Sequence, residues 1–117
     1  QGDGPPFGIP FAVTELRGEP VPEGVSQTLT LGEDGTVTGE AGCNNFSAGY
    51  ATMNQAIMIQ PARVTRMACP EDQMKSEQRF FALLTVVVSY EYDQETGMLA
   101  LSGVSGPPLM RLKAANP

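Results

Sequence analysis

The sequence predicts an α+β fold: a strand-rich, antiparallel, partly closed sheet or barrel with one main helix, over about residues 70–86, packed on it. Two observations predict it. The chain has 13 glycines and 10 prolines among 117 residues, a content that suits many turns and short strands rather than a helical bundle. Short apolar runs recur without strand–helix–strand alternation, which favours antiparallel pairing.

The chain has the organisation of one domain, because its length suits a single core. Residues 1–10, rich in glycine and proline, are predicted to be a flexible lead. Residues 11–113 form the predicted domain, and residues 114–117 are expected to fray. Because the chain begins at Gln1 and not at methionine, we expect a processed product from which a signal peptide has been removed.

The first half of the domain is predicted to consist of strands and turns. Residues 11–16 read as a strand, and residues 17–24 as an unpaired loop interrupted by two prolines and two glycines. Residues 26–31 and 36–41 form a predicted hairpin, because Asp34-Gly35 supplies the positive φ of a tight turn.

A second hairpin is predicted after residues 42–50, of which residues 44–50 are read as a polar loop. Its own turn lies around residues 53–55, and the strand that follows ends at Pro61, which has no N–H to donate to a sheet. Residues 63–67 are expected to be extended and to lead into the helix.

The helix is predicted from its start and from its apolar spacing. Pro70 suits a first helical turn, and Glu71 and Asp72 place negative charge at the positive end of the helix dipole. The apolar stripe consists of Met74, Phe81, Leu84 and Val88. The β-branched run at residues 86–88 favours an end near residue 84 or 85. Strands around Tyr90 and Tyr92, around Leu99 and Leu101, and over residues 109–112 complete the pattern.

Charge and hydropathy exclude two classes of partner. The net charge is −6, and an acidic chain repels phosphate, so nucleic acid is not an expected partner. The longest strongly apolar run, residues 82–88, is far shorter than the ~20 residues of a membrane span, so no transmembrane segment is predicted.

The two cysteines, Cys43 and Cys69, leave three alternatives open. With no histidine in the chain they make a poor zinc site, so neither a metal nor a cofactor is expected. They form a disulfide, remain two buried thiols, or include one reactive thiol. A disulfide suits an extracytoplasmic protein and stabilises a loop of this length by about 3–4 kcal/mol. A catalytic thiol normally needs a histidine base, so no catalytic residue is predicted and we expect no enzymatic activity.

Two groups of polar residues are candidates for other roles. The first is a recognition loop made of Asn44, Asn45, Ser47 and Tyr50. The alternative for its asparagines is a purely structural turn, because their side chains readily bond nearby backbone groups. The second group is Glu77, which lies beside the apolar stripe of the helix and is expected to pair with Arg66 or Arg63 as a structural brace.

A family resemblance rests on two motifs. Gly42-Cys43-Asn44-Asn45-Phe46-Ser47-Ala48-Gly49-Tyr50 precedes Thr65-Arg66-Met67-Ala68-Cys69-Pro70, and Glu77 and Phe81 follow in the helix. Together they resemble the META domain family, the family of the bacterial heat-inducible lipoprotein HslJ, over residues 11–112. The resemblance implies a compact α+β domain that is secreted, periplasmic or membrane-attached. It implies no established enzymatic activity, and no catalytic residue carries over.

The leading functional hypothesis is therefore a monomeric, non-enzymatic, secreted or periplasmic module. It would bind an unknown envelope protein, or act structurally, in cell-envelope maintenance or stress tolerance. The first alternative is a carrier that holds a lipid, a hydrophobic peptide or another small hydrophobic ligand, since six methionines offer adaptable apolar side chains. The second alternative is an enzyme inhibitor that acts through residues 44–50.

Overall fold

The computed structural model describes residues 6–114. Residues 1–5 and 115–117, which include half of the predicted lead and most of the predicted frayed end, lie outside the described residues. The elements in order are β1 (Phe11–Leu16), β2 (Glu19–Pro20), β3 (Thr28–Leu31), β4 (Thr36–Glu40), β5 (Asn45–Met53), β6 (Ala56–Ile59), β7 (Arg63–Val64), α1 (Glu71–Leu84), β8 (Ser89–Asp93), β9 (Met98–Ser102) and β10 (Met110–Ala114). The prediction that Ala114 frays needs correction. Ala114 is the last residue of β10, since it pairs with Phe11.

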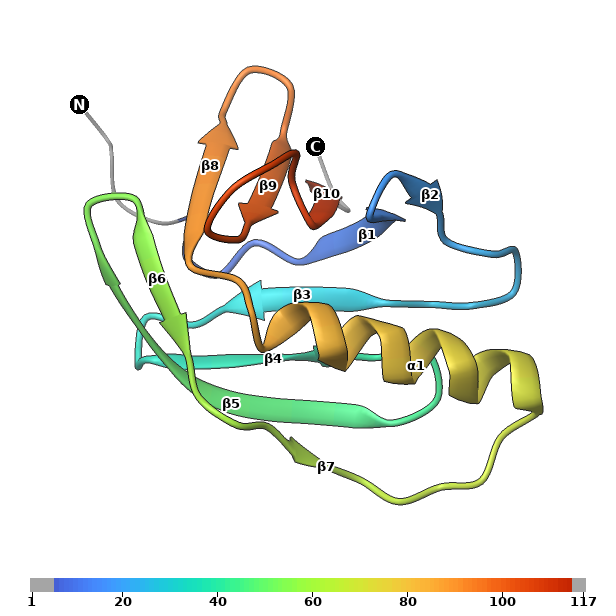
Figure 1. The fold of residues 1–117 in the computed structure, drawn as a ribbon. Helices are drawn as coiled ribbons and strands as arrows, with labels where there is room; N and C mark the ends of the chain where they lie inside the picture. The colour runs from blue at the N-terminus through green and yellow to red at the C-terminus, as the bar shows by residue number, and fades with distance from the viewer. Residues whose placement is uncertain (1–5, 115–117) are drawn as a thin grey trace.

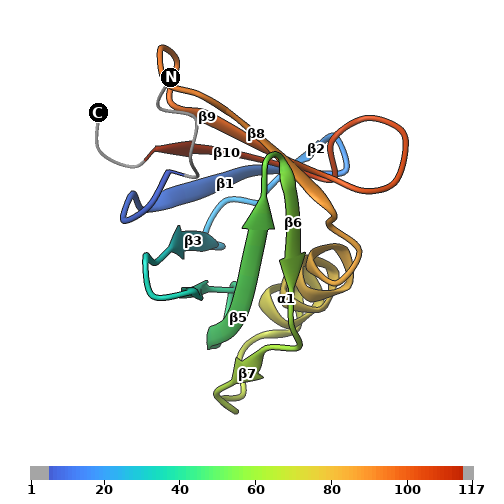
Figure 2. The ribbon, with the colours of Figure 1, turned by 90° about the vertical axis from the view of Figure 1, so that its left-hand side faces the viewer.

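The strands form a closed antiparallel barrel beside one helix, so the predicted α+β class is confirmed and the description as partly closed is corrected. Hydrogen-bonded neighbours run β1-β3-β4-β5-β6-β8-β9-β10 and return from β10 to β1. The closing pair joins Phe11 to Ala114 and Leu16 to Met110, with an irregularity between Val13 and Glu15. Such a bulge bends a strand and increases its twist. β1 pairs with β10 along one edge and with β3 along the other, which closes the barrel (Figure 1, Figure 2).

Both predicted hairpins are present. The first joins β3 to β4, with Gly35 at φ +84°, and the second joins β5 to β6 through Asn54 at φ +54°. The predicted unpaired loop 17–24 needs correction, because Glu19–Pro20 pairs with the end of β1. Arg17 and Gly18 have φ of +51° and +80° and turn the chain back on itself within two residues. Pro20 is tolerated there because β2 is an edge strand.

The loop predicted at residues 44–50 is mostly strand. Asn45 already belongs to β5, a nine-residue strand that pairs with β4 on one side and with β6 and β7 on the other. Pairing on both edges outweighs the local turn preference of the two asparagines, since each edge satisfies a row of backbone groups. Of the predicted extended segment 63–67, Arg63–Val64 forms β7, and residues 65–67 follow outside any strand.

Helix α1 begins at Glu71, directly after Pro70, with Glu71 and Asp72 in its first turn as predicted. It ends at Leu84, earlier than residue 86, because the β-branched residues that follow favour extended backbone. The helix lies beside the barrel and contacts β1 (Figure 1, Figure 2).

The core is shared between the barrel and the helix. Phe80 is fully buried, and its ring centroid lies 5.3 Å from that of Phe46 on β5 and 5.4 Å from that of Phe81. Phe46 and Phe81 meet edge to face at 5.6 Å. Aromatic pairs in such arrangements add to the stabilisation that burial of their area provides. This three-ring cluster therefore holds α1 against β5.

Phe80 is the test of this packing. We expect Phe80→Ala to lower the free energy of unfolding by about 3–5 kcal/mol, because it removes a fully buried ring from two aromatic contacts. Urea denaturation followed by circular dichroism measures the change. Val104→Ala, at a side chain that is 91% exposed, serves as the control and should shift stability by less than about 0.5 kcal/mol. Equal effects of the two substitutions would contradict the role given to the cluster.

Candidate functional site

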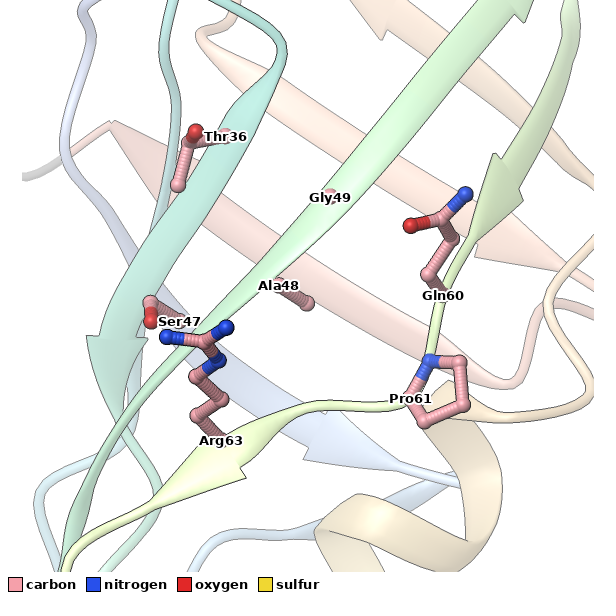
Figure 3. A pocket seen from close by; sticks show the side chains of 7 residues that line it. All are labelled: Thr36, Ser47, Ala48, Gly49, Gln60, Pro61 and Arg63. Atoms are coloured by element: carbon pink, nitrogen blue, oxygen red, sulfur yellow. The ribbon is translucent and has the colours of Figure 1, made fainter.

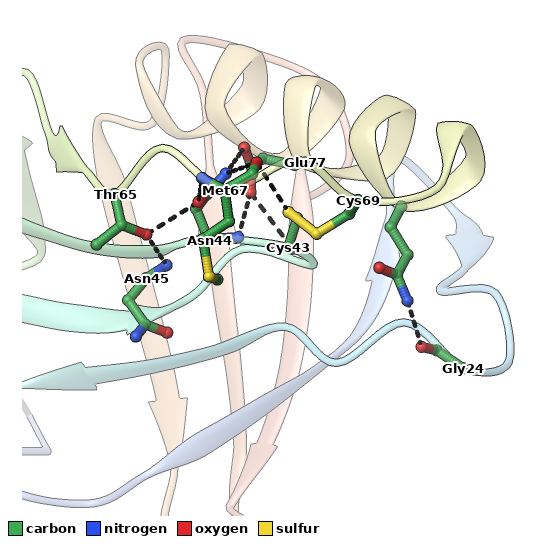
Figure 4. Close-up of a disulfide and its surroundings, with 9 residues drawn as sticks. Gly24, Cys43, Asn44, Asn45, Thr65, Met67, Cys69 and Glu77 are labelled. Atoms are coloured by element: carbon green, nitrogen blue, oxygen red, sulfur yellow. Dashed lines mark hydrogen bonds between the residues drawn. A yellow bond between two sulfur atoms is a disulfide. The ribbon is translucent and has the colours of Figure 1, made fainter.

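A buried carboxylate joins the helix to the chain between β4 and β5. Glu77 is only 7% exposed. Its Oε1 accepts the backbone N–H of Asn44 at 2.7 Å and that of Cys43 at 3.3 Å, and its Oε2 accepts Asn44 Nδ2 at 3.0 Å (Figure 4). These contacts satisfy polar groups at buried and part-buried positions. Glu77 therefore fixes the turn before β5 and the position of the Asn44 side chain.

Asn44 in turn holds the segment that precedes the helix, which we call the strap and define as residues 65–69. Asn44 Oδ1 accepts the backbone N–H of Met67 at 2.6 Å and the hydroxyl of Thr65 at 3.0 Å. Asn44 Nδ2 also contacts the carbonyl of Met67 at 3.4 Å. The Thr65 N–H donates to the carbonyl of Asn45 at 3.0 Å, and Thr65 Oγ1 accepts the Asn45 N–H at 3.1 Å. The Asn44 amide and the Asn45 backbone together hold the strap, which has no strand pairing of its own within residues 6–114 (Figure 4).

A disulfide fixes the end of the strap. Of the three alternatives for the cysteines, the structure contains the Cys43–Cys69 bond, with Cα atoms 6.0 Å apart. Both residues are half-buried, and the bond joins the turn before β5 to the residue before Pro70. Covalent and hydrogen-bonded attachments therefore converge on the same few residues.

The four residues predicted as a recognition loop do not form one loop. Asn44 is 3% exposed, and the other three belong to β5, where side chains alternate between the two faces. Asn45 and Ser47 point outward, whereas Tyr50 packs against the core. The structural role weighed for the asparagines fits Asn44. A role in recognition stays a prediction for the outward-facing pair.

Tyr50 belongs to the hairpin at the far end of β5. Its hydroxyl donates to the carbonyl of Gly32 at 2.5 Å. Burial, followed by the nearby Asp34, raises the pKa of Tyr50 above its ordinary value. A raised pKa favours the neutral phenol, which is the form that donates this hydrogen bond, so Tyr50 makes a structural contact here.

The predicted pairing of Glu77 with Arg66 or Arg63 is replaced by other contacts. Within residues 6–114 no ion pair joins Glu77 to either arginine, and Arg66 is exposed. The helix is instead braced by Arg79, which contacts Glu19 at 2.6 Å and the carbonyl of Leu16 at 3.2 Å. The sequence could not reveal this choice, because Arg79 and Glu19 lie far apart in the chain.

A groove that the sequence did not predict lies on the outer face of β5. It has a volume of about 420 Å³ and is lined by Thr36, Ser47, Ala48, Gly49, Gln60, Pro61 and Arg63. Gln60 and Arg63 stand before and after Pro61 along the chain that leads from β6 into β7, and both side chains extend toward β5 (Figure 3). A Cβ on Gly49 would lie 2.8 Å from Gln60 Oε1, so the glycine gives Gln60 room to cross the strand. In the sequence, the only indication of this groove is Pro61, which ends β6 and separates it from β7.

Two general features of the described residues bear on the class of site. No cluster of three or more histidine, cysteine, aspartate or glutamate side chains suited to a metal ion occurs among residues 6–114. Over the same residues, no helix is long and apolar enough to cross a membrane.

These features define a class of protein: a small barrel closed by β1 and β10, with one helix attached through a disulfide and a buried carboxylate. The sequence matches the family model of the META domain over residues 7–116. The chain therefore belongs to the META domain family, and the resemblance seen in its two motifs is confirmed.

Two solved structures are similar to this chain. An NMR structure of a protein from Burkholderia xenovorans has a TM-score of 0.77 at 20% identity, covering 95% of this chain and 84% of the other. A second NMR structure has a TM-score of 0.70 at 19% identity, covering 92% of this chain and 90% of the other. At these identities the likeness shows the fold alone. No curated protein matches the sequence.

The disulfide gives a prediction about stability. Reduction is expected to lower the free energy of unfolding by about 3–4 kcal/mol, because the open strap gains freedom mainly in the unfolded chain. Urea denaturation with and without reductant measures the change. A double variant carrying Cys43→Ala and Cys69→Ala is the control, and reductant should not alter its stability. Two free thiols in the unfolded, unreduced protein would contradict the bond.

The buried carboxylate gives a second prediction. Glu77→Ala leaves two backbone N–H groups without an acceptor and removes the nearer of the two acceptors of Asn44 Nδ2, so we expect a loss of about 3–5 kcal/mol. Glu77→Gln keeps one acceptor oxygen but turns an NH₂ toward Asn44, and should cost about 1–2 kcal/mol.

Glu71→Gln on the exposed side of the same helix is the matched control. It should change stability by less than about 0.5 kcal/mol, because its ion pair with Lys75 is solvent-exposed. Thermal and urea unfolding of the three variants provide the comparison. If Glu77→Ala were as stable as Glu71→Gln, Glu77 would not hold the turn.

Proposed function

We propose that this protein is a non-enzymatic binding module that works outside the cytoplasm, in cell-envelope maintenance or stress tolerance. The observation that carries the binding proposal is the open groove on β5. Its volume of about 420 Å³ falls within the range of pockets that take small ligands. The compartment is supported by the disulfide, since such bonds persist in oxidising surroundings. The envelope role rests on the resemblance to the META domain family.

The groove has the chemistry of a site for a polar ligand that carries a carboxylate. Arg63 is the only ionisable side chain among its lining residues. It forms no ion pair with another described residue, so its guanidinium is available to a ligand. Two hydroxyls, from Thr36 and Ser47, and the amide of Gln60 lie around it (Figure 3). A guanidinium binds a carboxylate through two parallel hydrogen bonds, and the neighbouring groups would orient the rest of the ligand.

The same residues support binding rather than catalysis. A guanidinium stays protonated in proteins, so Arg63 cannot act as a general acid or base. The chain has no histidine, and both of its cysteines are engaged in the disulfide, so neither supplies a thiolate nucleophile.

The carrier alternative is less well supported. A lipid would have to lie between α1 and the barrel, where Phe46, Phe80 and Phe81 pack against one another with ring centroids 5.3–5.6 Å apart. These rings fill the space that an acyl chain would need. The exposed polar groove is the better candidate for a ligand.

Titration of the ¹⁵N-labelled protein tests the proposal. The probes are N-acetyl-alanyl-alanine, which has a free carboxylate, and the same dipeptide with an amidated carboxyl end. We expect the acid to shift the backbone amide signals of residues 47–49, Gln60, Ala62 and Arg63, and the amide to leave them unchanged. Arg63→Ala should weaken binding of the acid about tenfold or more, because it removes a charge-assisted hydrogen bond.

Arg66→Ala is the matched control, because Arg66 is an exposed arginine nearby in the chain that does not line the groove. It should bind the acid as the unmodified protein does. The proposal fails if the acid and the amide shift the groove signals equally, if neither does, or if Arg63→Ala retains full affinity.

A further inference from the structure

The backbone groups of successive residues from 64 to 67 point alternately toward the barrel and away from it. The Thr65 N–H donates to the carbonyl of Asn45, and the Met67 N–H donates to Asn44 Oδ1, so both face the barrel. Val64 is paired with Phe46 one position before the Thr65 hydrogen bond. Peptide groups of successive residues in an extended chain point to opposite sides. The backbone groups of Val64 and Arg66 therefore face away from the protein.

The side chains of the same segment are available to a partner. Met67 is 52% exposed, Val64 is 36% exposed, and Arg66 is exposed. Within residues 6–114, Arg66 forms no ion pair. Within the described part of the chain, the segment thus presents the outward backbone groups of Val64 and Arg66 together with a positive charge that forms no ion pair.

We propose that residues 64–68 are an inhibitory segment that binds in the active-site cleft of a trypsin-like serine protease, with Arg66 in the specificity pocket. Such a cleft receives a peptide as an added antiparallel strand. The residue before the scissile bond and the residue two positions earlier turn their backbone toward the protease. With Arg66–Met67 as the scissile bond, these residues are Arg66 and Val64, the two whose backbone faces outward.

Arg66 determines the class of protease. The specificity pocket of trypsin-like enzymes has an aspartate at its base, which pairs with an arginine side chain. The chain has seven lysine and arginine residues, and Arg66 is the one that lies in the strap, where it is exposed.

The attachments of the strap explain why the segment inhibits and is not consumed. The protease serine attacks the Arg66 carbonyl, an Arg66–serine ester forms, and the Arg66–Met67 bond breaks as the Met67 nitrogen takes a proton from the catalytic histidine. The Met67 nitrogen lies 2.6 Å from Asn44 Oδ1, and the disulfide fixes Cys69, two residues further along the chain. The new amine therefore stays beside the ester and attacks it, which restores the peptide bond and frees the serine.

Rigidity also favours binding. The strap is held in one conformation before the protease arrives, so little conformational entropy is lost on association. The anchor beneath it is Glu77, which fixes Asn44. This inference is independent of the groove, because it depends on Arg66 and not on Arg63.

Inhibition of bovine trypsin by the intact, oxidised protein tests the inference. We expect stoichiometric inhibition of chromogenic substrate hydrolysis, with a nanomolar or lower dissociation constant, as is usual for protease–inhibitor pairs. Arg66→Ala should weaken inhibition about a thousandfold or more, whereas Arg66→Lys should retain most of it. Arg66→Leu should no longer inhibit trypsin and should inhibit chymotrypsin instead. Since Arg66 is exposed, these substitutions leave the fold intact.

Arg63→Ala and Lys75→Ala, at two other exposed basic residues, are the matched controls and should inhibit trypsin unchanged. Retained inhibition by Arg63→Ala together with loss of the groove titration would separate the two proposals. Absence of inhibition by the unmodified protein, rapid cleavage at Arg66–Met67 without inhibition, or equal inhibition by Arg66→Ala would overturn the inference.

Thr65→Val tests the hold on the strap. It removes the hydroxyl that bonds Asn44 and Asn45 at an exposed site. We expect mass spectrometry to show cleavage at Arg66–Met67 about tenfold faster than in the unmodified protein. An unchanged cleavage rate would overturn the role given to these hydrogen bonds.

Discussion

The contact between the Glu77 carboxylate and Asn44 is the one on which the rest of the structure depends. It joins three parts of the chain that no strand pairing connects: helix α1, the turn that starts β5, and the strap. A carboxylate accepts hydrogen bonds and donates none, so the position of the Glu77 side chain is set by the three N–H groups that donate to it. The aromatic cluster between α1 and β5 and the disulfide add to this contact. The helix and the strap are therefore positioned by a common anchor, although they bury different surfaces.

Strand β5 links the two surfaces to which we assign function. Its outward residues Ser47 and Gly49 form the floor of the groove, and the carbonyl of Asn45 receives the first hydrogen bond of the strap. Arg63 and Arg66 are three positions apart in the sequence, yet they belong to different surfaces. The reason is that β7 ends between them and the chain leaves the face of the barrel. A short stretch of sequence thus supplies two chemically distinct binding elements.

Local patterns in the sequence were sufficient to predict the hairpins, the start of the helix and the META family. Asp34-Gly35 and Pro70 act through backbone preferences that need no tertiary partner. The groove and the partner of Glu77 could not be predicted in this way. A carboxylate beside an apolar stripe fits an arginine or a backbone turn equally well, and only the packed fold decides. The asparagines show the same limit, because the two-sided pairing of β5 overrides their turn preference after Asn44.

The pairing of β1 with β10 has a consequence for the order of the chain. Phe11 and Ala114 are direct neighbours in the closing pair, so both ends of the domain lie at one seam of the barrel. A short linker across this seam, with new termini in the exposed segment around Val104, would give a circularly permuted chain with every strand pair retained. The order of the strands along the chain can therefore be changed in this fold while their order in the sheet is kept. The buried carboxylate, the disulfide and the strap all lie within one uninterrupted stretch of the permuted chain.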